Sequence, residues 1–252
     1  MTIPLQPGII YGPVRSRRLG RSLGINLLPT SYKVCTFNCL YCQYGWTRVH
    51  GRILKDRDQW PQVDQVYAAL KKSLQEISSS PDYITFSGNG EPTIYPNFPE
   101  VVDGVIKLRN DLAPWAKVAI LSNSTMVTDE NILAALSRLD VRIMKLDCGT
   151  SDCFKTYNRP VKGILFEDMV RGLTQLDDII IQSLFSGGPK GNFNPENIDA
   201  WIERIREISP TSVQLYTLDR GFPSDKIEPL NRPQLLELQE RLTSAGIVGE
   251  VF

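Results

Sequence analysis

Short apolar runs alternate with amphipathic helical patterns along most of this chain, and this alternation constrains its fold more than any other feature. Six runs are expected to form strands: residues 23–28, 83–86, 117–121, 142–146, 179–184 and 212–216. From the second run on, their starts are 25–37 residues apart. This spacing leaves room for one helix between successive strands, which is typical of β-α units and a parallel sheet. The sequence therefore predicts an α/β fold.

The intervals between the runs carry helix signals. The first interval has apolar residues on one helical face: Val63, Val66, Tyr67, Leu70, Leu74 and Ile77. Thr128 is a candidate N-cap, and Asn194 followed by Pro195 is typical of an N-cap and a first helical turn. Leucines at 235, 236, 238 and 242 predict a last helix, and residues 186–194 predict a Gly-rich loop.

Three cysteines lie close together after the first expected strand. Cys35, Cys39 and Cys42 follow a C-x3-C-x2-C spacing. Thiolates are soft ligands that suit iron–sulfur clusters and zinc. Three thiolates without a fourth leave one position open, as reactive metal sites do. Softness alone does not choose between the metals, but zinc knuckles usually show paired ligands, and the chain has a single histidine, His50. An iron–sulfur cluster is therefore favoured over a zinc site completed by a distant residue.

A Gly-rich turn with one acid follows the second expected strand. Residues 84–93 read ITFSGNGEPT, and Glu91 comes 49 residues after Cys42. Glycines allow the backbone to approach a ligand closely. Glu91 can accept a charged hydrogen bond from an ammonium group. Alone this segment could be a plain turn, but together with the cysteines it predicts a ligand site.

The two motifs resemble those of the radical S-adenosylmethionine (SAM) superfamily. The likeness rests on the cysteine spacing, on Tyr41 directly before the last cysteine, and on Gly90-Glu91-Pro92. It implies a partial (β/α)6 TIM-like barrel, a [4Fe-4S] cluster and SAM as cofactors. It also implies reductive cleavage of SAM to a 5′-deoxyadenosyl radical that abstracts hydrogen from a substrate. A reductant such as flavodoxin or ferredoxin would be a partner.

The same resemblance implies residue roles. Cys35, Cys39 and Cys42 would be the protein ligands of the cluster, and SAM would chelate the unique iron. Gly90 and Glu91 would hold the amino group of SAM, and Tyr41 would lie against the adenine. Ligands collect at the carboxyl ends of strands in such folds. Asp147 and Gln182, with Asn123 third, are therefore expected to meet the ribose and the carboxylate of SAM.

Longer segments resemble the wyosine-tRNA synthase branch of that superfamily. They are residues 11–26, Lys145-Leu146-Asp147, Asn158-Arg159-Pro160 and residues 213–220. Two departures matter: the wyosine enzymes carry a second cluster on N-terminal cysteines, whereas no cysteine precedes Cys35, and they are longer and more basic. The resemblance thus implies a compact relative of these enzymes, and it leaves the substrate undetermined.

At 252 residues, a single α/β barrel is as plausible as two small domains, and the resemblance implies one radical SAM domain over residues 1–252. We expect residues 1–21 to be an N-terminal extension, 22–220 the barrel core, and 221–252 a C-terminal helix and tail. The chain has no long apolar stretch and no signal pattern at its N-terminus. Five cysteines, three of them clustered, are typical of a reducing compartment. These features predict a cytoplasmic protein without a membrane partner.

Charge is unevenly distributed although the net charge is zero. Residues 1–57 hold nine Lys or Arg and one acid, so this segment is +8 and the remainder −8. Two interpretations stand: the basic residues meet an anionic substrate such as a tRNA or RNA base, or they pair with acids elsewhere and with the cluster. The zero net charge and compact length also allow a small metabolite or peptide as substrate. A non-enzymatic, metal-stabilised binding protein is the third alternative.

Cys148 and Cys153 follow the fourth expected strand, near the expected site. Cys148 is a candidate catalytic thiol that would donate hydrogen to a radical intermediate. The pair could also serve an auxiliary metal site, or be two small residues in a loop. Two cysteines cannot by themselves fill a second [4Fe-4S] cluster.

Overall fold

A computed structural model describes residues 2–50 and 59–252, and it is built around one eight-stranded sheet. In spatial order the strands are β1 (Ile10–Ser16), β2 (Gly20–Ile25), β5 (Tyr83–Phe86), β6 (Lys117–Ser122), β7 (Val141–Lys145), β8 (Ile179–Leu184), β10 (Ser212–Tyr216) and β12 (Gly249–Val251). The hairpin of β1 and β2 is antiparallel, and the other neighbours run parallel.

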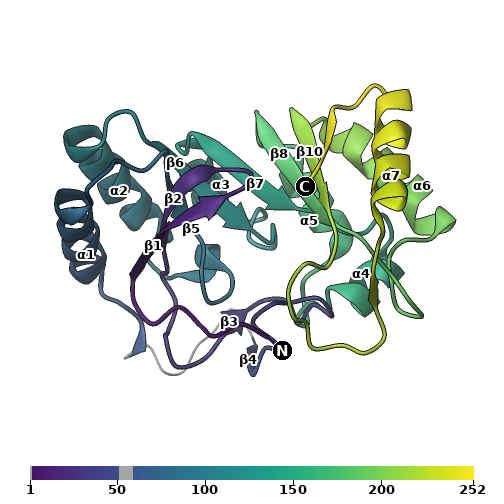
Figure 1. The fold of residues 1–252 in the computed structure, drawn as a ribbon, viewed down its shortest axis with the longest axis horizontal. Helices are drawn as coiled ribbons and strands as arrows, with labels where there is room; N and C mark the ends of the chain where they lie inside the picture. Colours follow the sequence, from purple (N-terminus) through teal and green to yellow (C-terminus); the bar gives the residue numbers. More distant parts are fainter. Residues whose placement is uncertain (1, 51–58) are drawn as a thin grey trace.

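Helices connect the parallel strands. They are α1 (Val63–Glu76), α2 (Phe98–Leu112), α3 (Glu130–Ser137), α4 (Ser151–Tyr157), α5 (Phe166–Leu173), α6 (Pro195–Ile208) and α7 (Arg232–Ser244). The minor elements are β3 (Val34–Cys35), β4 (Val49–His50), β9 (Ser186–Gly187), β11 (Glu228–Pro229) and a short 3-10 helix, η2 (Pro92–Ile94). Figure 1 shows the large strands in the middle, with α1 and α2 on one side and α6 and α7 on the other. None of the described helices is both long and apolar enough to cross a membrane.

The predicted α/β fold with a parallel sheet is confirmed. The six expected strands correspond to β2, β5, β6, β7, β8 and β10, which are consecutive neighbours in the sheet. Three of them have the predicted bounds: Tyr83–Phe86, Ile179–Leu184 and Ser212–Tyr216. Asn194 caps α6 as expected, but α3 is capped by Asp129 rather than Thr128, because the Asp129 carboxylate accepts from the backbone of Asn131 and Ile132.

The sheet extends beyond the six expected strands at both edges. The segment expected as an N-terminal extension contributes β1, and the expected C-terminal tail contributes β12, which pairs in parallel with β10. Residue 186 begins β9, which pairs with β11, so the predicted Gly-rich loop starts with a short ladder. Both edges of the sheet thus come from the ends of the sequence.

Side chains join the two edges of the sheet. The Arg18 guanidinium, in the turn of the β1–β2 hairpin, lies 4.5 Å from the ring centre of Tyr216 and 5.1 Å from that of Phe252. Tyr216 ends β10, and Phe252 follows β12. Arg17 forms a 2.8 Å ion pair with Asp219. These contacts, which we call the seam, close the open side of the sheet without backbone pairing.

Helix α6 braces the exit of β7. Trp201 is fully buried, and its ring meets that of Phe185 edge-on, with centroids 4.9 Å apart. Its indole nitrogen donates to the Leu146 carbonyl oxygen at 3.0 Å. Leu146 precedes Asp147, so this helix fixes the backbone where a predicted site residue leaves the sheet.

Candidate functional site

The cysteine loop is anchored to the Gly-rich turn that follows β5. The Val34 backbone accepts a hydrogen bond from the Glu91 nitrogen at 3.2 Å and donates to the Asn89 oxygen at 3.1 Å. Gly90 has φ +146°, and a Cβ there would lie 1.6 Å from the Val34 carbonyl oxygen. Only glycine allows this approach. The two predicted motifs are therefore in direct backbone contact.

The other side of the loop is anchored to the end of α4. The Asn38 nitrogen donates to the Asn158 carbonyl oxygen at 3.0 Å, and the Leu40 nitrogen donates to the Tyr157 oxygen at 3.1 Å. A bridge also joins Phe37 to Pro160. The loop is thus held between the segment after β5 and the segment after β7, at the carboxyl ends of the strands.

A polar group contacts each cysteine sulfur, from the same loop for Cys42 and from distant segments for Cys35 and Cys39. The Lys33 ammonium donates to the Cys42 sulfur at 2.9 Å. The side-chain amide of Asn123 lies 3.5 Å from the Cys35 sulfur. The amide of Asn158 lies 3.6 Å from the sulfur of Cys39. Such donors stabilise negative charge on sulfur and tune a bound metal centre.

The cysteines fit a metal cluster chemically. Burial raises the pKa of Cys35 to about 11 and that of Cys39 to about 12. Bound iron would supply the positive charge that converts such thiols to thiolates. Among the side chains that the structure describes, no three His, Cys, Asp or Glu converge on a point where a single metal ion would sit. Three cysteines on one loop, each contacted by a hydrogen-bond donor, are a soft donor set that fits an iron–sulfur cluster.

Glu91 is buried and engaged by the protein. Its Oε1 accepts from the Thr93 nitrogen at 3.1 Å, the Thr93 hydroxyl at 2.6 Å and the Ser122 hydroxyl at 2.9 Å. Its Oε2 accepts from the Asn123 nitrogen at 2.6 Å. Burial raises the pKa of Glu91, and these hydrogen bonds oppose the increase. Glu91 therefore ties the exit of β5 to the exit of β6. Within Gly90-Glu91-Pro92, Gly90 lines the cavity described below.

Asp147 is the centre of a second buried network. Its Oδ1 accepts from the Lys145 ammonium at 2.7 Å and from the Leu184 nitrogen at 2.9 Å. Its Oδ2 accepts from the Tyr41 hydroxyl, and from the Asn158 amide at 2.7 Å. This carboxylate connects β7, β8, α4 and the cysteine loop.

Lys145 extends that network towards the seam. Its ammonium donates to the Tyr216 hydroxyl at 2.7 Å and lies 5.1 Å from the Tyr41 ring centre. Burial lowers the pKa of Lys145, but Asp147 and Tyr216 outweigh that effect and leave it above its ordinary value. Lys145 therefore stays charged beside both aromatic rings.

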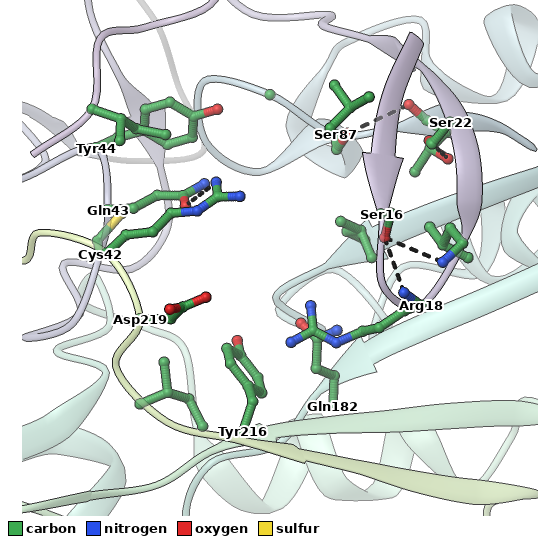
Figure 2. A pocket seen from close by; sticks show the side chains of 18 of the residues that line it. Ser16, Arg18, Ser22, Cys42, Gln43, Tyr44, Ser87, Gln182, Tyr216 and Asp219 are labelled. Carbon is green, nitrogen blue, oxygen red and sulfur yellow. Dashed lines mark hydrogen bonds between the residues drawn. The ribbon is translucent and has the colours of Figure 1, made fainter. Parts of the chain in front are cut away.

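A cavity of about 500 Å³ opens between the cysteine loop and the β1–β2 hairpin. Figure 2 shows Cys42 and Gln43 on one side, with Arg18 and Gln182 on the other. Of the predicted site residues, Cys35, Cys42, Tyr41, Gly90 and Gln182 line it. Gln182 donates to Gln214 through Nε2, and its Oε1 has no partner among the described residues. The volume is within the range of small-ligand sites.

Other predicted residues lie behind the wall of this cavity. Cys39, Glu91, Asn123 and Asp147 do not line it; Asn123 contacts the lining residue Cys35, and Asp147 contacts the lining residue Tyr41. Cys148 is also outside the wall; its sulfur lies 2.7 Å from that of Cys153 and 3.5 Å from the Asn158 amide oxygen. Burial raises the pKa of Cys148 far above its ordinary value. The side chain of His50 is outside the described part of the structure.

Sequence reasoning gave no role to two residues that contact the cysteines. Lys33 lies two positions before Cys35, and its nearness to the motif was an available signal. Asn158 belongs to the Asn-Arg-Pro segment that supported the wyosine-branch resemblance, but nothing local showed that its amide would reach Cys39.

The family model described as "Radical SAM superfamily" matches residues 30–205, which include the cysteine loop, the Gly90 turn and the Asp147 network. This chain belongs to the radical SAM superfamily. The cofactors of radical SAM proteins are a [4Fe-4S] cluster and SAM, so the predicted cofactors are confirmed at the level of the superfamily.

Relatives found by sequence include several UPF0026 proteins. The chain is 31% identical to one from Synechocystis sp., with 85% of this chain and 77% of that protein covered. It is 28% identical to one from Helicobacter pylori, with 92% and 72% covered. It is also 30% identical to a Brachyspira hyodysenteriae protein named GTPase Obg, with 90% of this chain covered but only about a third of that protein (32%). The chain has no Gly-Lys pair and hence no P-loop, so that name is not carried over.

Solved radical SAM structures share the fold. TYW1 with a bound lysine-pyruvate adduct superposes with a TM-score of 0.64 at 14% identity, with 90% of this chain and 75% of that chain covered. Streptococcus suis SuiB bound to S-adenosylmethionine also gives 0.64, at 12% identity, with 90% and 50% covered. The expected partial barrel of radical SAM type is therefore confirmed, and the TYW1 match agrees in fold with the predicted wyosine-branch likeness.

Proposed function

We propose that this chain is an enzyme that binds a [4Fe-4S] cluster through Cys35, Cys39 and Cys42 and uses SAM to abstract hydrogen from a substrate in the cavity. The observation that carries this proposal is that Cys35 and Cys42 share one cavity with Tyr41, Gly90 and Gln182. Residues from the cysteine loop, the Gly-rich turn and β8 meet there although they are distant in sequence.

The chain provides complementary groups for SAM at this cavity. The backbone at Gly90 approaches it without a side chain, beside the Glu91 carboxylate. Gln182 presents its free Oε1, which can accept from a ribose hydroxyl. The Tyr41 ring is fixed through its hydroxyl by Asp147 and can stack on adenine. Asp147 and Asn123 would act by orienting these first contacts.

Cys35, Cys39 and Cys42 would hold the cluster, and the bound cluster and SAM would supply the radical chemistry that takes hydrogen from the substrate. The protein orients the reactants and excludes water. Leu19, Leu121 and Leu184 give the cavity apolar walls. The positively charged Lys33 ammonium lies against the Cys42 sulfur. The electron would come from a reduced flavodoxin or ferredoxin.

Anaerobic reconstitution tests this function. We expect about four irons and four sulfides per chain, with SAM cleavage on reduction. Alanine at Cys35, Cys39 or Cys42 should abolish both, whereas Cys153→Ala should retain the iron content. Zinc without iron, or a fourth protein ligand, would contradict the proposal and support the metal-stabilised binding protein instead.

An RNA base is the candidate substrate that the exposed arginines favour. Arg15 and Arg220 line the cavity mouth without a carboxylate partner among the described residues. A nucleic-acid backbone can bind such a mouth. A small metabolite or peptide remains the alternative, and salt-dependent RNA binding by the reconstituted protein separates the two.

A further inference from the structure

Arg18 is a partly buried cation without an anionic partner. Its Nε is buried and makes no hydrogen bond, and its side chain forms no ion pair among the described residues. The rings of Tyr216 and Phe252 hold the guanidinium in place. Figure 2 shows it beside Gln182 at the cavity. Removing a charge from water without pairing it is unfavourable, so this arginine is prepared for a ligand that the chain does not supply.

Three other cations around the cavity have polar partners, which sets Arg18 apart from them. Arg17 pairs with Asp219, Lys33 contacts the Cys42 sulfur, and Arg220 donates to Gln43. Arg15 is exposed, whereas Arg18 faces the interior of the cavity. Burial lowers the pKa of Arg18, Tyr216 and Asp219 oppose that effect, and Arg17 and Arg220 add to it. An added anion would relieve this mutual repulsion.

The cofactors of the proposed function would add little negative charge beside Arg18. A [4Fe-4S]²⁺ cluster on three thiolates carries one negative charge, and SAM that chelates iron through its amino and carboxylate groups would be neutral overall, because its sulfonium balances its carboxylate. The cluster charge would lie at the cysteines, where Lys33 already donates to the Cys42 sulfur. The substrate, which has to enter this space, is therefore the candidate source of a negative group for Arg18.

We propose that Arg18 is an anion subsite that binds an oxyanion group, a phosphate ester or a carboxylate, of the substrate. This inference rests on the proposed function, because it places the substrate in the same cavity as SAM. The planar guanidinium offers two parallel N–H donors to such a group, and the aromatic contacts fix its plane before binding. The neighbouring Gln182 Oε1 remains available for SAM.

Titration calorimetry on the SAM-loaded, reconstituted protein tests the subsite. Phenyl phosphate and phenylacetate are the probes, because they carry the two oxyanions on the same aromatic ring. We expect one of them to bind, and Arg18→Gln to weaken its binding about tenfold or more, as expected when charged hydrogen bonds are removed. The better probe identifies the oxyanion.

Two control variants keep the test decisive. Arg21→Gln makes the same charge change on the same hairpin, but Arg21 donates to Ser79 and Ser80 and does not line the cavity; it should retain probe binding within about twofold. Phe252→Leu removes one of the two aromatic contacts of Arg18 and keeps the guanidinium, so it separates loosening of the seam from loss of the subsite.

Four results would overturn the subsite: neither probe binds, Arg18→Gln binds the probe as tightly as the unaltered protein, Phe252→Leu weakens binding as much as Arg18→Gln, or Arg18→Gln weakens SAM binding by the same factor. Iron content and SAM affinity are measured on the same samples. A protein without cluster or SAM binding contradicts the proposed function, whereas one that has both but binds neither probe contradicts the subsite alone.

Discussion

Glu91 and Asp147 are buried carboxylates, and the chain supplies each with four hydrogen-bond donors. Each therefore stabilises the strand exits on which a ligand would rest, whether or not it also touches that ligand. Removing such an acceptor leaves buried donors unsatisfied. Stability and ligand affinity should consequently change together at these positions.

Glu91→Ala is expected to lower the unfolding free energy by about 2 kcal/mol or more, because the donors of Thr93, Ser122 and Asn123 lose their acceptor. SAM affinity should fall about ten- to a hundredfold if Glu91 also holds the amino group. Urea unfolding and SAM calorimetry measure the two effects, with the exposed Glu130→Ala as control. An unchanged dissociation constant would remove Glu91 from the SAM site, and unchanged stability would contradict its bracing role.

Lys33→Met is expected to make the reduction potential of the reconstituted cluster more negative. The Lys33 ammonium lies 2.9 Å from the Cys42 sulfur, where its charge favours the reduced state. An EPR-monitored redox titration measures the potential. The same substitution at the exposed Lys71 is the control, and an equal shift in both variants would rule out a specific effect of Lys33.

The cysteines could be identified from the sequence because their signal is local: three thiols and a tyrosine within eight residues. Lys33 and Asn158 could not be assigned in the same way. Asn158 reaches the Cys39 sulfur from 119 positions away, through the fold of α4 against the cysteine loop. The network around Asp147 likewise depends on four elements that only the tertiary structure brings together.

At the scale of elements, the buried parallel strands were predictable and the edge strands were not. Ile84 and Ile181 are buried and lie in continuous apolar runs, which are typical of strands that are covered on both faces of the sheet. Strand β1 is largely exposed and contains Pro13 and Arg15, so its sequence lacks the alternation of apolar and polar residues that predicts a strand. Strand β12 has three residues, too few for any pattern. Both edges were consequently assigned to an extension and a tail.

Trp201→Phe tests how strongly α6 braces the exit of β7. The variant loses the indole hydrogen bond to Leu146, which still accepts from Ser183, so a loss of about 1 kcal/mol is expected. Trp201→Ala adds a cavity and should cost about 3–5 kcal/mol. Denaturant unfolding measures both, and Trp115→Phe, at a 62% exposed position, should stay within about 0.5 kcal/mol. Equal stability of the two Trp201 variants would contradict the packing role.

At the scale of the whole molecule, the charge asymmetry is only partly neutralised by the fold. Among the described residues, Arg17 with Asp219 is the ion pair that links the basic N-terminal segment to the acidic remainder. Arg21 turns to Ser79 and Ser80 instead. Arg52, Lys55 and Arg57 are outside the described residues. Among the described basic residues of the N-terminal segment, Arg17 is thus the one that pairs with an acid as expected. Positive charge therefore remains at the cavity mouth.

Replacing Arg15 and Arg220 with glutamine should weaken RNA binding and flatten its salt dependence by about one unit of slope for each arginine–phosphate interaction removed. The melting temperature should hardly change, because both side chains are exposed. Fluorescence anisotropy over a salt series measures the slope. Arg206→Gln with Lys71→Gln, on helices α6 and α1, is the matched control. Unchanged affinity in the test variant would favour a small substrate over RNA.

The seam also determines where this barrel is weakest. Separating any two neighbouring strands breaks a ladder of backbone hydrogen bonds, whereas parting the seam costs two cation–π contacts and one exposed ion pair, each worth on the order of 1 kcal/mol. We therefore expect thermal fluctuations to open the barrel at the seam while the neighbouring strands stay paired. Opening along this line would widen the cavity, because Arg17, Arg18 and Asp219 all belong to its wall.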